Sequence, residues 1–194
     1  PGKIPSRLSS RFKLGIQEKD FVLIWIGRLE KIKRPERLLK ISKELSKYHV
    51  SHKILVVGDG ILKFDLEKTV ESEKLPIHFY GWQKDVWLYL AAADLLLLTS
   101  DNEGMPITLI EAAHLGLPSI STEVGSVADV IINGKTGYLT PLDDSEIAQR
   151  ITQLASSVEL RNEFGKAAKE YAKNNFSVDA MIDFHKSLYK SLLN

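Results

Sequence analysis

The sequence predicts an α/β fold built on a doubly wound parallel sheet. Short, continuously apolar runs recur along the chain, and such runs are typical of strands buried on both faces. Segments with helical periodicity separate these runs, and strand and helix alternate at least five times. The 194 residues, 44% of them hydrophobic, are enough for one domain with a sizeable core. We therefore expect helices on both faces of the sheet, joined by right-handed crossovers.

The predicted elements follow one another in a regular order. Strands are expected at residues 21–26, 53–57, 77–80, 95–99, 118–121 and, as a short sixth strand, 137–139. The helix after the first strand is opened by Pro35 and the helix after the fourth by Pro106, which is placed at the first helical position. Further helices are expected at residues 62–73, 86–92, 126–130, 144–156, 158–173 and 178–193.

Composition excludes several classes of protein. There are 26 basic and 25 acidic residues, so the net charge of +1 gives no general attraction to nucleic acid. The absence of cysteine excludes a disulfide framework, a zinc–thiolate site and a cysteine nucleophile, and it fits a cytosolic protein. No apolar run approaches the length of a membrane span, and the N-terminus does not have the pattern of a signal peptide.

The most informative stretch is Ser100–Gly116, which reads as a turn followed by a helix. A helix start offers unpaired N–H groups and a partial positive charge, so it can bind an anion. Glu111 lies roughly 7 Å beyond that start, on the face that carries Ile107 and Thr108, and could accept hydrogen bonds from hydroxyls. Glu103, on the turn, could reach a group on the anion's other side. A phosphate between two polyols has the shape of a nucleotide sugar, although a merely solvated Glu111 explains the spacing equally well.

Functional residue types gather after the predicted strands. In a parallel sheet the positions just after each strand share the carboxyl edge, where ligands bind. The residues that meet this criterion are Arg28, Gly58, Gly60, Trp82, Asn102, Glu103, Glu123 and Gly125. The pattern predicts one cleft lined by a cation, glycines and carboxylates.

The stretch from Glu103-Gly104-Met105-Pro106 to Glu111-Ala112 resembles the E-x7-E motif of retaining glycosyltransferases of family 4, whose fold is called GT-B. Gly27-Arg28 followed by Lys33 resembles the family's pair of cations that binds the donor's diphosphate. The family usually has glycine after that lysine, whereas this chain has Arg34. The likeness runs from about residue 21 to the C-terminus.

Other segments resemble the same family in order. Gly58-Asp59-Gly60 resembles a glycine-rich turn of the family, although a tight turn without ligand contact is at least as good an interpretation. Phe79-Tyr80-Gly81-Trp82-Gln83 resembles the strand and turn beside the nucleotide base, where Trp82 either stacks on the base or packs. Glu123-Val124-Gly125-Ser126 and Asn133-Gly134-Lys135-Thr136-Gly137 resemble supporting turns.

The resemblance implies the donor-binding half of a two-domain enzyme. It implies a linker at residues 1–20, a nucleotide-sugar-binding domain at 21–175 and a C-terminal crossover helix at 176–194. The missing N-terminal domain would hold the acceptor, and this chain alone would be inactive. The implied reaction transfers a hexose-type sugar from a nucleotide diphosphate sugar, with UDP or GDP favoured, to a glycan, lipid or small molecule with retention. The implied localisation is cytoplasmic, with any membrane association peripheral.

Roles carry over only to matching positions. The catalytic residues expected from the resemblance are Glu103, Arg28 and Lys33, and the donor-binding residues are Arg28, Lys33, Trp82, Gln83, Glu103, Gly104, Ile107, Thr108 and Glu111. No metal or other cofactor is expected, because in the family the cations and the helix start replace a divalent metal. His49 and His52 come nearest to a metal-ligand spacing, but both are expected to be exposed.

Three alternatives remain open. A glycoside hydrolase would also use two carboxylates, but it would not need the neighbouring cations. A non-catalytic nucleotide-binding module would bind the same ligands without turnover. A nucleotide-sugar epimerase with the GT-B fold is the third, and the E-x7-E spacing and the Arg28–Lys33 pair argue against it.

Overall fold

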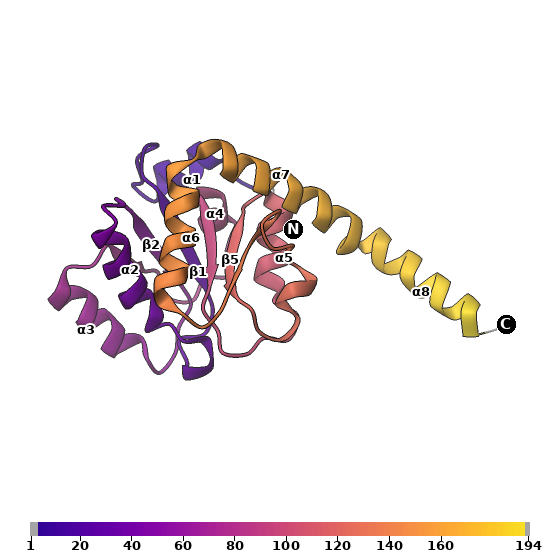
Figure 1. Ribbon diagram of the computed structural model, residues 1–194, viewed down its shortest axis with the longest axis horizontal. Coiled ribbons are helices and arrows are strands. Elements are labelled where there is room, and N and C mark those ends of the chain that lie inside the picture. Colours follow the sequence, from indigo (N-terminus) through magenta and orange to yellow (C-terminus); the bar gives the residue numbers. More distant parts are fainter. Residues whose placement is uncertain (1–3, 193–194) are drawn as a thin grey trace.

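The computed structural model describes residues 4–192. Within them, a parallel six-stranded sheet forms the centre of the molecule, with strand order β3-β2-β1-β4-β5-β6 (Figure 1). The strands are β1 (Val22–Ile26), β2 (Lys53–Val57), β3 (Ile77–Phe79), β4 (Leu95–Leu98), β5 (Ser119–Thr122) and β6 (Gly137–Thr140). The predicted doubly wound parallel sheet is confirmed, and each strand lies within two residues of its predicted bounds.

Helices cover both faces of the sheet. They are α1 (Arg7–Lys13), α2 (Arg37–Lys47), α3 (Lys63–Glu73), α4 (Trp87–Ala92), α5 (Ile107–Leu115), α6 (Asp144–Ser156), α7 (Val158–Asn175) and α8 (Val178–Leu192), with 3-10 helices η1 (Lys31–Lys33) and η2 (Gly125–Asp129). Because side chains alternate along a strand, Leu23 and Trp25 of β1 pack with α2, α3 and α6, whereas Val22 and Ile24 pack with α4 and α5. Both faces are buried, which explains the continuous apolar runs.

The two prolines stand slightly before the helices that they were expected to open. Pro106 has extended backbone angles (φ −78°, ψ 94°) and caps α5, which begins at Ile107. Pro35 lies two residues before the start of α2, whose N-cap is Glu36. The helix expected at 126–130 is a 3-10 helix, η2, which ends at Asp129 with Val130 as its C-cap. The prolines therefore set the direction from which the chain enters each helix rather than supplying its first turn.

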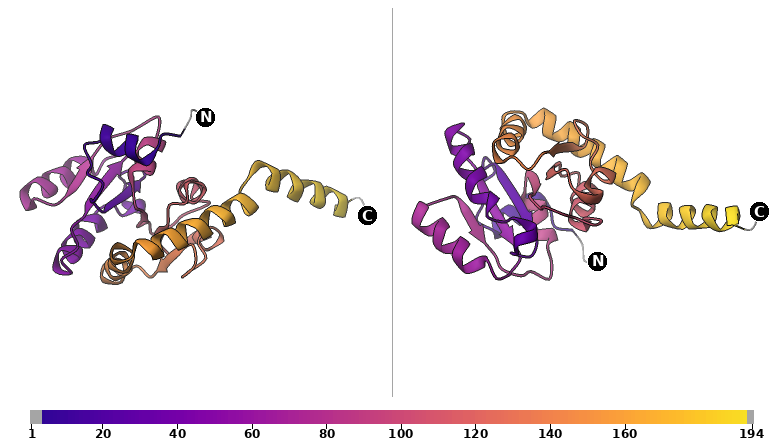
Figure 2. Two further views of the ribbon diagram at one scale, coloured as in Figure 1. Left: turned by 90° about the horizontal axis from the view of Figure 1, so that it is seen from above. Right: turned by 60° about the horizontal axis from the view of Figure 1, so that its bottom comes forward.

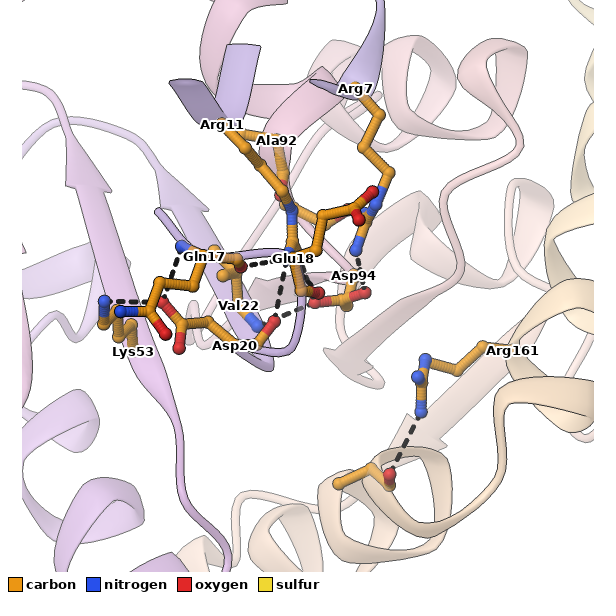
Figure 3. A network of polar contacts seen from close by, with 12 residues as sticks. Arg7, Arg11, Gln17, Glu18, Asp20, Val22, Lys53, Ala92, Asp94 and Arg161 are labelled. Carbon is orange, nitrogen blue, oxygen red and sulfur yellow. Dashed lines mark hydrogen bonds and ion pairs between the residues drawn. The ribbon is translucent and has the colours of Figure 1, made fainter. Parts of the chain in front are cut away.

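The expected linker is the largest difference in the described chain. Residues 1–3 lie outside the described residues, but residues 7–13 form α1, which packs against α4. Arg11 of this helix is only 1% exposed. Its guanidinium donates to the carbonyls of Gln17 and Glu18 at 2.8 Å and of Ala92 at 3.0 Å (Figure 3). The segment before β1 is therefore folded onto the amino edge of the sheet.

Asp94 is the acid that balances this buried cation. Its carboxylate accepts hydrogen bonds from Arg11 at 2.7 Å, from Arg7 at 2.6 Å and from the main-chain N–H of Val22 at 2.8 Å (Figure 3). Burial lowers the pKa of Arg11, and the neighbouring Asp94 carboxylate opposes that shift. The network joins α1 to the first residues of β1 and β4, so it fixes the amino edge of the sheet.

The C-terminal helix α8 extends away from the rest of the molecule (Figures 1 and 2). None of its described residues is buried, and several large apolar side chains on it are exposed, including Met181, Phe184 and Tyr189. Residues 193 and 194, the end of the expected crossover helix, lie outside the described residues. No helix within residues 4–192 is both long enough and apolar enough to cross a membrane.

Candidate functional site

The order in which successive strands are added to the sheet reverses between β1 and β4. From β1 the chain moves outward through β2 and β3, and it then returns to the other side of β1 to form β4, β5 and β6. Loops that leave two adjacent central strands in opposite directions open a crevice at the carboxyl edge, which is where open α/β sheets bind ligands. All pairings are parallel, so the residues predicted to follow the strands do share that edge. The candidate site lies there.

Lys33 and Glu103 meet across this crevice. Lys33 follows β1 and Glu103 follows β4, and the Lys33 Nζ lies 2.7 Å from both carboxylate oxygens of Glu103. Ser100 donates its hydroxyl hydrogen to Glu103 Oε1 at 2.5 Å. The Glu103 side chain is 8% exposed and that of Lys33 is 22% exposed. Two of the three residues expected to be catalytic are thus brought into direct contact.

A buried hydroxyl supports the main chain at Lys33. Thr99, at the end of β4, accepts a hydrogen bond from the indole N–H of Trp25 at 3.0 Å. The Thr99 Oγ1 also lies 3.0 Å from the Lys33 carbonyl and 3.2 Å from that of Arg34, so it donates to this pair of carbonyls. Trp25 and Thr99 are both fully buried. The core of the sheet therefore positions the segment that carries Lys33.

Arg28 presents its guanidinium to solvent. Its side chain is 71% exposed and pairs with Glu30 at 3.1 Å, a contact that a ligand can displace at small cost. No ion pair or hydrogen bond among the described residues joins Arg28 to Lys33 or Glu103. The two predicted cations thus follow the same strand: Lys33 is paired with Glu103 and largely buried, whereas Arg28 is mostly exposed and paired only with Glu30 among the described residues.

Arg34, next to Lys33, has an unusual backbone. Its φ of 51° and ψ of 46° lie in the left-handed region, which costs a non-glycine residue on the order of 1 kcal/mol. The glycine that the resemblance leads one to expect here would adopt these angles without that cost. The Arg34 Nε lies 3.1 Å from Glu36 and 3.4 Å from Asp101. No role for Arg34 follows from sequence reasoning, because neither its left-handed backbone nor its contact with Asp101, 67 residues away, can be predicted from local spacing.

Close backbone approaches explain two glycines of the carboxyl edge. A Cβ at Gly125 would lie 1.7 Å from the Glu103 carbonyl oxygen, and a Cβ at Gly58 would lie 1.8 Å from that of Gly27. Both glycines also have positive φ angles, 52° and 143°. Their loops pack on the backbones that carry Glu103 and Arg28. Packing alone is therefore sufficient to require glycine at both positions.

Helix α5 begins beside the crevice. Ile107 is 66% exposed, Thr108 is half-buried, and Gly104 faces open space on its Cβ side. Glu111 is partly buried one turn along the helix, and this burial raises the pKa of its carboxyl. Among the described residues, no side chain and no main-chain N–H donates a hydrogen bond to the Glu111 carboxylate. Glu111 thus remains able to accept hydrogen bonds from a bound molecule.

Trp82 and Gln83 lie at the far end of the same edge, after β3. Trp82 is 72% exposed, so it packs little and offers a free aromatic face. The Gln83 side chain donates to the Tyr80 carbonyl at 2.8 Å, which fixes the turn. The main-chain N–H of Gly58 donates to the Gly81 carbonyl at 2.8 Å. The loops after β2 and β3 are thereby joined, and Trp82 belongs to the same row of loops as Arg28.

Four residues that support the site were not among the site residues predicted from the sequence: Ser100, Thr99, Trp25 and Asp101. The strand pattern places three of them just after β4, but the roles of Trp25, Thr99 and Asp101 depend on contacts between distant segments that no local spacing reveals. Ser100 contacts Glu103 within one loop, and its role depends on the conformation of that loop. The expectation that His52 is exposed is wrong. Its Nδ1 lies 2.8 Å from the Val50 carbonyl and its Nε2 lies 2.9 Å from Ser42 Oγ, and burial lowers its pKa. His52 is a neutral core histidine rather than a ligand.

A cavity of about 560 Å³ lies at the opposite, amino edge of the sheet. Its wall includes Arg7, Asp20, Asp94 and Arg161 (Figure 3). Arg7 is paired with Asp94, and Asp20 is paired with Lys53. Arg161 donates to the Leu154 carbonyl at the end of α6. These charged groups are engaged with one another or with helix ends, so the cavity is a weaker candidate than the carboxyl edge.

Comparison with known proteins agrees with the fold. A sequence model of the family described as glycosyl transferases group 1 matches residues 6–171. The chain therefore belongs to that family, whose GT-B type fold it shares with its structural neighbours.

One curated relative and two solved structures illustrate the likeness. The N-acetyl-alpha-D-glucosaminyl L-malate synthase of Bacillus anthracis is 32% identical over 92% of this chain and 48% of its own. Anabaena HepE, solved with UDP and glucose, is 21% identical with a TM-score of 0.82 over 97% of this chain and 52% of its own. The C-terminal domain of LpcC, a glycosyl transferase group 1 protein of Francisella tularensis, is 21% identical with a TM-score of 0.79 over 89% of this chain and 94% of its own. The chain thus spans about half the length of the curated relatives that it matches.

Proposed function

We propose that the carboxyl edge of the sheet binds a nucleotide diphosphate sugar, and that this chain is the donor-binding, C-terminal half of a retaining glycosyltransferase of family 4. The observation that carries the proposal is the Lys33–Glu103 pair in the β1–β4 crevice, with Arg28 exposed beside it. The relatives support it: HepE was solved with UDP and glucose, and an isolated C-terminal domain of a group 1 protein has nearly the length of this chain.

The diphosphate would lie between the cations and the start of α5. Arg28 forks onto phosphate oxygens and Lys33 supplies a point charge. The first N–H groups of α5, at Ile107 and Thr108, point out of the helix start and complete the anion site. Charge grows on the phosphate as the sugar leaves, so donors already in place stabilise the transition state. In this proposal these groups do the work of a divalent metal.

Lys33 must change partner for this to happen. In the free protein its ammonium group contacts both oxygens of Glu103. A bound diphosphate draws Lys33 toward itself and leaves the Glu103 carboxylate, still hydrogen-bonded by Ser100, to accept from the hydroxyls of the sugar. Glu111 accepts from the ribose hydroxyls, and its raised pKa is consistent with a carboxylate that lacks partners until the ligand binds.

The other end of the donor fits the loop after β3. Trp82 offers an aromatic face on which a base can stack, and Gln83 holds the turn that presents it. The transfer step breaks the bond between the anomeric carbon and the phosphate oxygen and forms one to the acceptor oxygen. The acceptor's hydroxyl proton passes to the departing phosphate. The acceptor, and any peripheral attachment to the cytoplasmic face of a membrane, belong to the preceding domain.

Calorimetric titration of the chain with UDP, GDP and ADP tests the proposal. Saturable binding of one nucleotide is expected with magnesium or with a chelator, and Arg28→Ala and Glu111→Ala should each weaken it about tenfold or more. Arg150→Ala, which removes a half-exposed arginine on α6, is the control and should bind as the unaltered chain does. Binding that strictly requires magnesium, or that both site variants leave unchanged, would refute the proposed site.

A further inference from the structure

The segment of Lys33 is attached to the loop after β4 at a second point. The main-chain N–H of Asp101 donates to the Ile32 carbonyl at 2.9 Å, and the Arg34 Nε lies 3.4 Å from an Asp101 carboxylate oxygen. Lys33 meanwhile contacts Glu103, two residues further along the same loop. Consecutive side chains, those of Lys33 and Arg34, therefore hold one loop at two places.

Arg34 has an unfavourable backbone conformation. Its φ of 51° is left-handed, and the following Pro35 further restricts its backbone. The Arg34, Glu36 and Asp101 side chains are 37–39% exposed, so their ion pairs add little to the stability of the whole fold, and their effect is confined to the position of one loop. A strained residue that gains so little stability, placed beside a binding crevice, points to a functional reason for its retention.

We propose that Arg34 is a positioning residue of the donor site, which keeps the loop of Asp101 and Glu103 in place when Lys33 turns to the ligand. The inference rests on the proposed function, in which the diphosphate draws Lys33 away from Glu103. Once that contact opens, the Arg34–Asp101 ion pair and the Asp101–Ile32 hydrogen bond still join the two segments. Glu103 then stays where it can accept from the sugar.

Substitutions can show whether Arg34 positions the loop or is an arginine without a function in binding. Arg34→Gly removes both the strain and the ion pair, Arg34→Lys retains the charge, and Asp101→Asn removes the other partner. Lys74→Gly is the matched control, because Lys74 ends α3 in the same conformation (φ 54°, ψ 42°), is exposed, and forms no ion pair among the described residues. Each variant is titrated with UDP, GDP and ADP and is unfolded thermally.

The proposal predicts a loss of affinity without a loss of stability. Arg34→Gly should weaken nucleotide binding about three- to fivefold, the range that a half-exposed ion pair supports, while its thermal midpoint stays equal or rises. Arg34→Lys should restore affinity to within about twofold, and Lys74→Gly should bind as the unaltered chain does. Asp101→Asn should also weaken binding, and combining it with Arg34→Gly should add little.

Two results would overturn the inference. Unchanged affinity in Arg34→Gly would show that the arginine is only tolerated. Tighter binding in Asp101→Asn would show that Arg34 acts directly on the anion and that Asp101 merely opposes it. If the unaltered chain binds none of the three nucleotides, the proposed function fails, and amide hydrogen exchange in the free protein decides the positioning role. The Asp101 amide should then exchange faster in Arg34→Gly than in Lys74→Gly, and equal rates would refute the role.

Discussion

Single residues of the site differ in how much the fold depends on them. Lys33 and Glu103 form a largely buried pair, so removing one partner leaves the charge of the other buried without a counter-charge. Arg28 is 71% exposed, and the fold hardly depends on it. Glu111 lies between these extremes, because its burial is partial and its pKa is raised. Substitutions at these positions should therefore separate stability from binding.

Lys33→Met should lower the free energy of unfolding by about 1–3 kcal/mol, because it leaves the Glu103 carboxylate buried without its cation. Arg28→Ala should change it by no more than about 0.5 kcal/mol. Both substitutions should weaken nucleotide binding. Urea unfolding of the two variants compares their free energies of unfolding. Equal values would mean that the Lys33–Glu103 contact contributes nothing to the stability of the fold.

Glu111→Gln should raise stability near neutral pH by a few tenths of a kcal/mol while it weakens nucleotide binding. Because burial raises the pKa of Glu111 above the ordinary 4.5, the unfolded chain binds fewer protons than the folded one above that pH. Stability is therefore lost as the pH rises from about 4.5, and the variant escapes this loss. Urea unfolding near pH 7 and near pH 4 measures this difference in stability between the variant and the unaltered chain. Glu163→Gln, which changes an exposed glutamate, is the control. A variant less stable than the unaltered chain near pH 7 would contradict the account.

At the scale of elements, the site is a row of loops held together by their main chains. The N–H of Leu29 donates to the Asp59 carbonyl at 2.9 Å, and the N–H of Ser126 lies 3.4 Å from the Glu103 carbonyl. The loop after β1 thus rests on the loop after β2, and the loop after β4 rests on η2. A side chain added between two of these loops should disturb the site without touching a ligand.

Gly125→Ala tests this dependence. The new Cβ would lie 1.7 Å from the Glu103 carbonyl oxygen, at a φ of 52°. We expect a loss of about 2 kcal/mol or more in unfolding free energy and a clear loss of nucleotide affinity. Gly134→Ala is the control, since its φ of 73° is also positive but nothing lies within 4 Å of its Cβ. It should lose about 1 kcal/mol and bind normally. Equal effects of both substitutions would rule out the clash as the cause.

The elements also show why part of the fold was predictable from sequence. Strands buried on both faces are continuous apolar runs, and β1, β2 and β4 were predicted almost to the residue. Helix α1 was missed because its stability depends on Arg11, whose acidic partner Asp94 is 83 residues away. The Lys33–Glu103 contact spans 70 residues, so only the resemblance and the sheet topology could place the two residues in one site. The role of Arg34 could not be predicted because it is a contact between two loops, and that of Ser100 because it depends on how the loop after β4 folds back on itself.

At the scale of the whole molecule, the first and last helices of the described chain differ in how they are attached to the rest of it. Near the start, α1 is fastened to the amino edge through Arg11, Arg7 and Asp94 (Figure 3). At the other end, α8 extends away from the body (Figure 2). Its apolar side chains Met181, Phe184 and Tyr189 are exposed. The start of the domain is therefore part of its rigid body, on the side of the sheet opposite to the proposed donor site.

Arg11→Met should lower the unfolding free energy by about 3 kcal/mol or more, because it leaves Asp94 and several carbonyls without their donor. Arg7→Ala should cost about 1 kcal/mol or less, since the Arg7 side chain is 45% exposed. Denaturant unfolding of both variants provides the comparison. The assigned role of the network would be wrong if Arg11→Met were as stable as Arg7→Ala.

The most direct test of the central claim is a map of backbone amide chemical shifts in the chain, with UDP, GDP and ADP added in turn. We expect saturable shifts for one nucleotide in the loops at residues 27–33, 58–60, 81–83 and 101–108 and along the first turns of α5. Shifts confined instead to the amino-edge cavity around Arg7, Asp20 and Arg161 would contradict it, because the nucleotide would then bind on the wrong side of the sheet.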